Sequence, residues 1–254
     1  MGLHFDRTGD GPAVLLLHPV GLDRTFWADL PARLSQTRTV VTVDTRGHGR
    51  SQPAERPGRM AQRVADVVEL IETLGIGPAT LVGVSFGGMI AQNVAGTRPD
   101  LVSGLVVAGC PLAVPAAAHA AMRQRGADAE AGGMEAVVEA TLERWFTAGF
   151  MASETVAGVR ARLLADASSG WAAAWEAICE HDARDLLPRF GGRTLVIAGE
   201  EDKATTVAAM REIAEAAANA RMAVLPGAPH IMHLETAREF GDLVCDFVGS
   251  GAPA

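Results

Sequence analysis

The stretch Leu81–Ile90 reads LVGVSFGGMI, an apolar run that breaks into small residues around one serine and then becomes apolar again. Its centre, Gly83–Gly87, matches the pattern G-x-S-x-G between a predicted strand and a predicted helix. A tight strand-to-helix turn forces the serine into an unfavourable backbone conformation, so its neighbours must lack bulky side chains. The pattern predicts that Ser85 projects from this turn as a nucleophile. A glycine turn in which Ser85 caps a helix is the alternative, and a dinucleotide-binding loop is a weaker one because its glycine spacing is not met.

Apolar runs typical of strands recur on both sides of this stretch, at 13–17, 39–43, 79–84, 104–108, 194–198 and 222–225. Several are continuous rather than alternating, as expected for strands covered on both faces. Helical patterns lie between them, at 60–74, 85–97, 204–218 and 235–248. Strand alternating with helix predicts an α/β fold, with a mostly parallel sheet flanked by helices.

The alternation fails between about residues 111 and 188, where the sequence is alanine-rich and helical in character. A structureless loop of this length is uncommon in a compact domain. We therefore expect residues 111–188 to form a helical cap over a core made by residues 1–110 and 189–254. Ordinary crossover helices are the alternative. The segment holds three of the four tryptophans, Trp145, Trp171 and Trp175.

Composition narrows the class of protein. Of the 254 residues, 48% are hydrophobic and 20% charged, which is typical of a globular chain. The net charge of −8 argues against a nucleic-acid partner, although a locally positive pocket could still take a small anion. The N-terminus lacks a signal-peptide pattern, and no apolar run approaches the ~18 residues that span a bilayer. We expect a cytoplasmic protein with no membrane partner; its oligomeric state is not predicted.

Cysteines and histidines give no sign of a metal centre. The three cysteines are an odd number at wide spacing, which favours reduced thiols over disulfides, and no His/Cys set has metal-ligand spacing. The expected chemistry therefore uses side chains alone, with no metal and no cofactor.

A serine nucleophile needs a nearby histidine as its base. Downstream of Ser85 the chain offers His119, His181, His230 and His233. The first two lie in the expected cap, away from the sheet. His230 sits in the tight loop directly after the last predicted strand, so we favour it over His233, whose alternative role is capping or surface packing at the next helix.

The carboxylate that orients the base should follow the preceding strand. The strand at 194–198 runs into Gly199–Thr205, and we favour Asp202 there. Glu200 and Glu201 are rivals that could equally belong to a solvated loop, and Asp202 itself could cap the next helix.

Two backbone N–H groups should face the developing negative charge. Phe86, after the nucleophile, is one expected donor. The other lies in the turn after the strand at 13–17, where Pro19 has no N–H and Val20 is the candidate. We expect His18 to brace this turn, and Asp44–Ser51 to be a hydrogen-bonded structural loop rather than a catalytic one.

Four segments of the chain, GVSFGGMIAQ (83–92), LERWFTAGF (142–150), AGEEDKAT (198–205) and ARMAVLPGAPHIMHLE (220–235), carry a family resemblance. Over nearly its whole length the chain resembles the α/β-hydrolase superfamily, and within it the 3-oxoadipate enol-lactonase family. The resemblance implies Ser85 as nucleophile, Asp202 as acid and His230 as base. The HPVGLD turn (18–23) and the second indole of Trp171-Ala-Ala-Ala-Trp175 depart from the enol-lactonase pattern.

The function implied is hydrolysis of a carboxylic ester, above all an enol-lactone that carries a free carboxylate. We expect a cation in the pocket, with Arg144 as the candidate against a solvated-surface role, and contacts from Trp145, Trp171 and Trp175. A general carboxylesterase, a carbon–carbon bond hydrolase and a perhydrolase are alternative enzymes. A ligand-binding receptor on the same fold is the non-enzyme alternative.

Overall fold

A computed structural model describes residues 2–250; Met1 and residues 251–254, which the predicted core includes, lie outside the described residues. Seven strands form one sheet in the order β1-β3-β2-β4-β5-β6-β7. Only β1 runs antiparallel to its neighbour, while the other adjacent strands pair in parallel. The strands are β1 (Phe5–Thr8), β2 (Ala13–Leu17), β3 (Thr39–Val43), β4 (Ala79–Val84), β5 (Val102–Ala108), β6 (Arg193–Gly199) and β7 (Asn219–Leu225).

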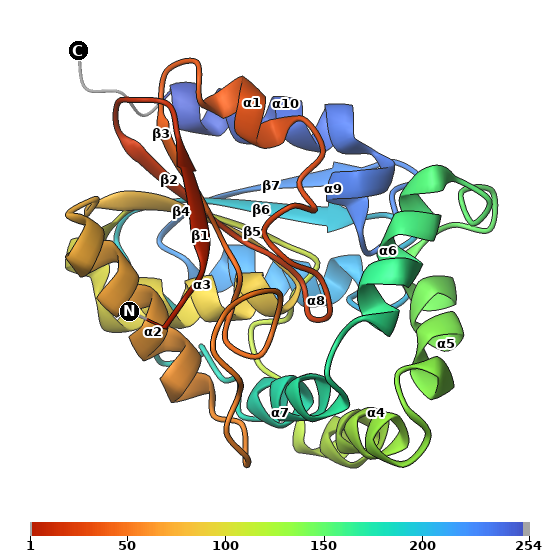
Figure 1. Cartoon of the computed structure of the whole chain (residues 1–254). Helices are drawn as coiled ribbons and strands as arrows, with labels where there is room; N and C mark the ends of the chain where they lie inside the picture. Colours follow the sequence, from red (N-terminus) through yellow and green to blue (C-terminus); the bar gives the residue numbers. More distant parts are fainter. Residues whose placement is uncertain (1, 251–254) are drawn as a thin grey trace.

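Helices cover both faces of this sheet, with α1 and α10 on one side and α2, α3 and α8 on the other (Figure 1). The helices outside the segment between β5 and β6 are α1 (Leu30–Leu34), α2 (Met60–Leu74), α3 (Phe86–Thr97), α8 (Val207–Ala216), α9 (Met232–Glu235) and α10 (Ala237–Gly249). The predicted α/β fold with a mostly parallel sheet is confirmed. Within residues 2–250, no helix combines the length and apolar character needed to cross a membrane.

The packing of strand β2 explains why its sequence is apolar at every position. Leu15 and Leu17 pack into one hydrophobic cluster, whereas Val14 and Leu16 pack into a second. Because successive side chains point to opposite faces of a sheet, a strand covered on both faces must be apolar at every position.

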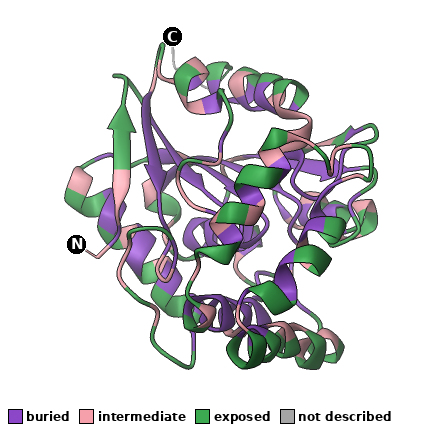
Figure 2. Ribbon diagram, turned by 45° about the vertical axis from the view of Figure 1, so that its right-hand side comes forward, coloured by how far each residue is buried: buried purple, intermediate pink, exposed green. Residues whose placement is uncertain are grey.

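Two elements differ from the sequence prediction. Strand β1 was not expected, because its sequence FDRT is polar and its side chains are mostly exposed at the sheet edge (Figure 2). The last predicted helix, 235–248, begins two residues later than expected, because α10 starts at Ala237 and Glu235 is the last residue of the short helix α9 (Met232–Glu235). The Glu235 carboxylate accepts hydrogen bonds from the backbone N–H (3.1 Å) and the hydroxyl of Thr147, so it serves a tertiary contact.

Four helices fill the segment between β5 and β6: α4 (His119–Gly132), α5 (Glu135–Trp145), α6 (Glu154–Leu164) and α7 (Ser168–Cys179). No strand occurs between β5 and β6 in the described chain. These helices gather on one side of the molecule, the side toward which the arrowhead of β6 points (Figure 1). Helix α7 is largely buried and packs against α4, which is more exposed. The division into core and cap stays a prediction.

Candidate active site

Ser85 lies in the turn between β4 and α3 with φ 52° and ψ −116°, a strained conformation for a residue with a side chain. Its backbone N–H donates to the Ala108 carbonyl at 2.8 Å. The turn is tight enough to require glycine on both sides. A Cβ at Gly83 would lie 2.4 Å from the Gly87 carbonyl oxygen, and one at Gly87 would lie 1.9 Å from the Leu17 carbonyl oxygen.

His230 and Asp202 meet Ser85 from the two loops that follow β7 and β6. His230 Nε2 is 3.0 Å from Ser85 Oγ, and His230 Nδ1 is 2.9 Å from Asp202 Oδ2. All three residues are buried. Because a carboxylate only accepts hydrogen bonds, Nδ1–H donates to Asp202 and leaves Nε2 of the neutral ring as an acceptor for the serine hydroxyl. The arrangement can take a proton from Ser85.

Backbone hydrogen bonds fix the positions of the Asp202 carboxylate and of the loop that carries His230. Asp202 Oδ1 accepts from the N–H groups of Ala204 (2.7 Å) and Thr205 (2.8 Å). The neighbouring N–H of Glu201 donates to the Ala228 carbonyl at 2.9 Å, which ties the acid loop to the loop of His230. The carboxylate is therefore fixed by its own loop as well as by the imidazole.

The rival carboxylates lie elsewhere. Glu200 and Glu201 are exposed, and Glu200 Oε2 accepts from the Gly227 N–H at 2.8 Å. Among the three acidic residues of this loop, Asp202 alone is hydrogen-bonded to His230.

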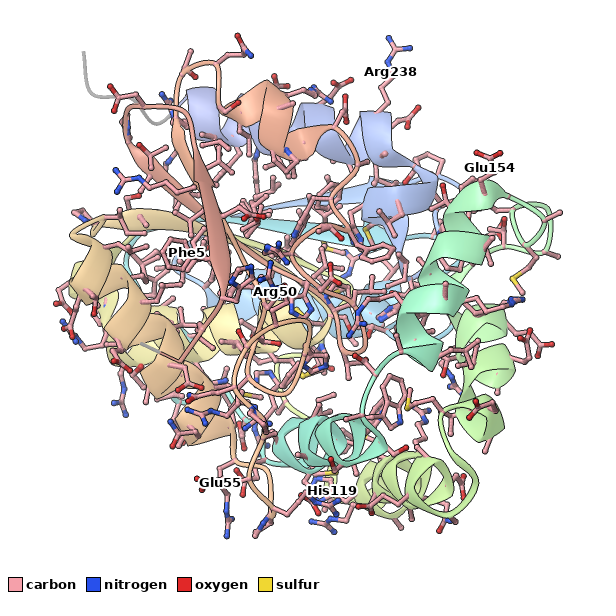
Figure 3. All side chains as sticks on the ribbon, in the orientation of Figure 1. Phe5, Arg50, Glu55, His119, Glu154 and Arg238 are labelled. Carbon is pink, nitrogen blue, oxygen red and sulfur yellow. The ribbon has the colours of Figure 1, made fainter. Side chains whose placement is uncertain are left out.

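The other histidines have separate surroundings. His119 starts α4 (Figure 3) and faces the Val114 carbonyl at 3.3 Å. His181 Nε2 faces the Pro111 carbonyl at 3.0 Å, and burial lowers its pKa to about 4. His233 is buried between the rings of Trp27 and Phe240 rather than at the surface, which corrects its alternative role; burial lowers its pKa to about 3.

His18 braces the turn after β2, as expected. Its Nε2 accepts from the Thr45 N–H at 2.9 Å, so Nδ1 carries the proton and donates to the Pro19 carbonyl at 2.6 Å. Burial lowers the pKa of His18, in keeping with this neutral tautomer. Within residues 2–250, neither the Val20 N–H nor the Phe86 N–H donates to a protein acceptor. Both predicted donors are thus available.

The loop Asp44–Ser51 is a hydrogen-bonded structural loop, as predicted. The buried carboxylate of Asp44 accepts from the backbone N–H groups of Arg24 and Arg50, each at 2.8 Å. The Ser51 hydroxyl donates to the Asp44 carbonyl at 2.6 Å.

A cavity of about 1020 Å³ opens over Ser85 and His230. Its walls include Val20, Arg144, Trp145 and Trp175, four of the residues that the sequence singles out. The Trp145 ring centroid lies 6.4 Å from that of His230.

Trp171 is not part of this lining, which corrects the expectation that it contacts substrate. Its ring packs edge-on against Trp175, with 5.7 Å between ring centroids, and its indole N–H donates to the Arg125 carbonyl at 3.1 Å. A Cβ on Gly21 would lie 2.7 Å from the Trp171 ring. Trp171 therefore fills the space between the cavity wall and the turn after β2.

A further arginine of the cavity wall is marked by no pattern in the sequence. Arg125 of α4 is half-buried and lines the same cavity as Arg144. It belongs to no motif and stands among alanine and other charged residues, so no sequence signal identifies it. In residues 2–250, no cluster of three or more His, Cys, Asp or Glu side chains could hold a metal ion.

Comparison with known proteins places the chain among hydrolases. Residues 14–243 match the alpha/beta hydrolase family. The chain is 31% identical to 3-oxoadipate enol-lactonase 2 of Acinetobacter baylyi (92% of this chain, 88% of that protein), and 32% identical to a pimeloyl-[acyl-carrier protein] methyl ester esterase of Chromobacterium violaceum (94% and 95%). Its fold matches the enol-lactonase of Burkholderia xenovorans LB400 with a TM-score of 0.92 and 34% identity, over 97% of this chain and 96% of that one. With its fold and most of its length matched, the chain belongs to the alpha/beta hydrolase family.

Proposed function

We propose that this protein is a serine hydrolase that cleaves carboxylic esters through an acyl-enzyme, with an enol-lactone such as 3-oxoadipate enol-lactone as the favoured substrate. One observation carries the proposal. Ser85 Oγ, the His230 ring and the Asp202 carboxylate form an unbroken hydrogen-bonded line at 3.0 Å and 2.9 Å, at the base of a cavity. Hydrolase relatives that act on lactones and esters support it.

In the first half-reaction His230 Nε2 takes the proton of Ser85 as Oγ attacks the substrate carbonyl. Asp202 accepts the Nδ1–H throughout and stabilises the charged imidazolium. The carbonyl oxygen becomes an oxyanion, for which the N–H groups of Val20 and Phe86 are the proposed donors. Loss of one such donor costs on the order of 3 kcal/mol in other enzymes.

Collapse of the tetrahedral intermediate breaks the bond between the carbonyl carbon and the leaving oxygen, which takes the proton from His230. In an enol-lactone the leaving oxygen is an enol that tautomerises to a ketone and stays within the same molecule. Water then loses a proton to His230, attacks the acyl carbon and releases Ser85. These side chains supply the nucleophile, the base and the oxyanion donors, so the proposed cycle uses no cofactor.

We assign substrate binding to the segment between β5 and β6 and propose that residues 111–188 act as a cap on the core. Trp145 and Trp175 give the cavity aromatic walls. Arg144, an exposed residue of the same lining, is the candidate for binding a substrate carboxylate. An anionic lactone meets both features, because it presents an apolar ring and a negative charge.

A general carboxylesterase is the second candidate, favoured by the size of the cavity. Ligand pockets usually measure about 300–1,000 Å³, and this one measures about 1020 Å³. A small lactone leaves much of that volume empty, whereas a longer acyl chain fills it.

Labelling with a fluorophosphonate tests the reaction class. We expect the folded protein to react at Ser85 and the Ser85→Ala variant to stay unlabelled. A panel of an enol-lactone, aryl esters of increasing acyl length and a vinylogous diketone then ranks the substrates. A folded protein whose Ser85 resists the label would refute the hydrolase and favour a receptor.

A further inference from the structure

Arg125 is held in the cavity wall by contacts that leave its charge free. The centre of its guanidinium lies 4.5 Å from the centroid of the Trp175 ring, within the range of a cation–π contact. Its backbone carbonyl accepts the Trp171 indole N–H at 3.1 Å, which ties α4 to α7 at this residue. A cation–π contact uses the positive charge and leaves the guanidinium N–H groups able to donate.

No carboxylate of the described chain forms an ion pair with Arg125 or with Arg144. Both guanidinium groups therefore lie at the cavity without a carboxylate partner, unlike that of Arg56, which pairs with Glu176 at 2.7 Å. Four carboxylates line the same cavity, those of Asp128, Glu180, Asp182 and Glu212. Asp128 accepts from Gln124 at 2.8 Å on its own helix, while Glu180 pairs with Arg59 and Asp182 with Arg184.

The positive charge of Arg144 acts on Arg125. Burial, and then the nearby positive charge of Arg144, lower the pKa of Arg125. Two like charges beside one cavity repel, and their cost falls when an anion lies between or beside them. Trp175 adds a further donor, since its buried indole N–H has no acceptor within residues 2–250.

We propose that Arg125, stacked on Trp175, determines specificity by binding the free carboxylate of an anionic ester, with Arg144 contributing a second guanidinium. The inference rests on the proposed function and adds to it a specificity-determining residue; the substrates concerned are monoesters and lactones of dicarboxylic acids. The planar guanidinium suits a carboxylate because it can donate two parallel hydrogen bonds. The ester carbonyl lies at Ser85, and the carboxylate lies toward α4 and α7.

The test compares one charged and one neutral substrate of the same length, monomethyl adipate and dimethyl adipate. For Arg125→Gln we expect kcat/KM on the monoester to fall about 10–100-fold, mainly through a higher KM. This is the change in affinity expected when one hydrogen bond to a charged group is lost. On the diester we expect a change within about threefold. Arg125→Lys should recover part of the loss, since lysine keeps the positive charge but cannot donate two parallel hydrogen bonds to a carboxylate.

Arg123→Gln is the matched control. Arg123 lies on the same helix, is exposed and does not line the cavity, so its loss removes an equal charge from the protein without touching the site. We expect it to leave both substrates within about twofold. Thermal melting of each variant establishes that it folds.

Binding separates this proposal from the hydrolase assignment. Calorimetric titration of Ser85→Ala with monomethyl adipate should show binding that weakens about 10–100-fold when Arg125→Gln is added. Equal affinity with and without Arg125, or equal kinetic losses on both esters, would overturn the carboxylate site. A protein that binds the monoester through Arg125 but hydrolyses no ester would instead retain the site and refute the proposed reaction.

Discussion

Replacing Asp202 with asparagine tests the proposed mechanism at its most sensitive point. Asp202 Oδ1 accepts two backbone N–H groups, from Ala204 at 2.7 Å and Thr205 at 2.8 Å. An asparagine oxygen must take that position, because an amide nitrogen there would face two donors. The amide NH₂ is then placed where Oδ2 lies, 2.9 Å from His230 Nδ1.

Oδ1 also lies 3.1 Å from His230 Nδ1, but it already accepts two backbone N–H groups, so we expect the closer amide NH₂ to reverse the histidine tautomer. A donor at the position of Oδ2 makes Nδ1 an acceptor, so the ring proton moves to Nε2, which lies 3.0 Å from Ser85 Oγ. A protonated Nε2 cannot take the serine proton. The corresponding change in another serine hydrolase lowers kcat by about 10⁴, equivalent to about 5 kcal/mol of barrier. We expect a similar loss here.

The assay is steady-state hydrolysis of an aryl ester near neutral pH, with the melting temperature as a check on folding. Glu201→Gln is the matched control, because it removes a neighbouring carboxylate that is exposed, whereas the hydrogen bonds to His230 Nδ1 come from Asp202. We expect it to keep kcat within about twofold. If Asp202→Asn folds and keeps kcat within tenfold of the parent, the tautomer argument is wrong.

Three further predictions concern other residues: Arg144 in the cavity wall, Gly87 in the Ser85 turn and the buried Asp166. Arg144→Ala should raise KM for an anionic lactone and spare a neutral aryl ester; equal losses on both count against carboxylate binding. Gly87→Ala should lower the melting temperature, because its Cβ would lie 1.9 Å from the Leu17 carbonyl oxygen; an unchanged melt contradicts this. Burial outweighs the ion pair with Arg162 and raises the pKa of Asp166 from 3.8 to about 7. The folded state therefore binds an extra proton between these values, and the free energy of unfolding falls as pH rises through them, by an amount on the order of a few kcal/mol. Denaturant titrations across that pH range should show the fall relative to Asp166→Asn, and parallel curves would refute it.

The core of the fold could be predicted because burial on both faces leaves a direct trace in the sequence. Continuous apolar runs mark β2 and β4, and the glycines of the Ser85 turn mark the point where β4 passes into α3. Strand β1 left no such trace, since an exposed edge strand is held by backbone pairing with β3 rather than by apolar side chains.

Some of the residues around Ser85 could likewise be predicted from the sequence, and others could not. His230 and Asp202 follow strands of a parallel sheet, whose carboxyl ends share one edge, so chain order alone brings them near Ser85. Trp171 and Trp175 stand four residues apart on one face of α7 and look equivalent in sequence. Their roles differ because the turn after β2 packs against Trp171 and buries it, whereas Trp175 lines the cavity. The sequence does not show this packing.

A contact between α5 and the loop of His230 connects the proposed substrate-binding residues with the proposed base. The Ile231 N–H, one residue after the proposed base His230, donates to the Trp145 carbonyl at 3.2 Å. Trp145 follows Arg144 directly in the chain and forms part of the same cavity wall. A movement of α5 that carries Arg144 toward or away from a bound carboxylate must therefore strain or break the bond that holds the loop of His230. Substitutions in this helix should consequently change kcat and KM together, whereas substitutions at Arg125 on α4, which has no such bond, should act mainly on KM.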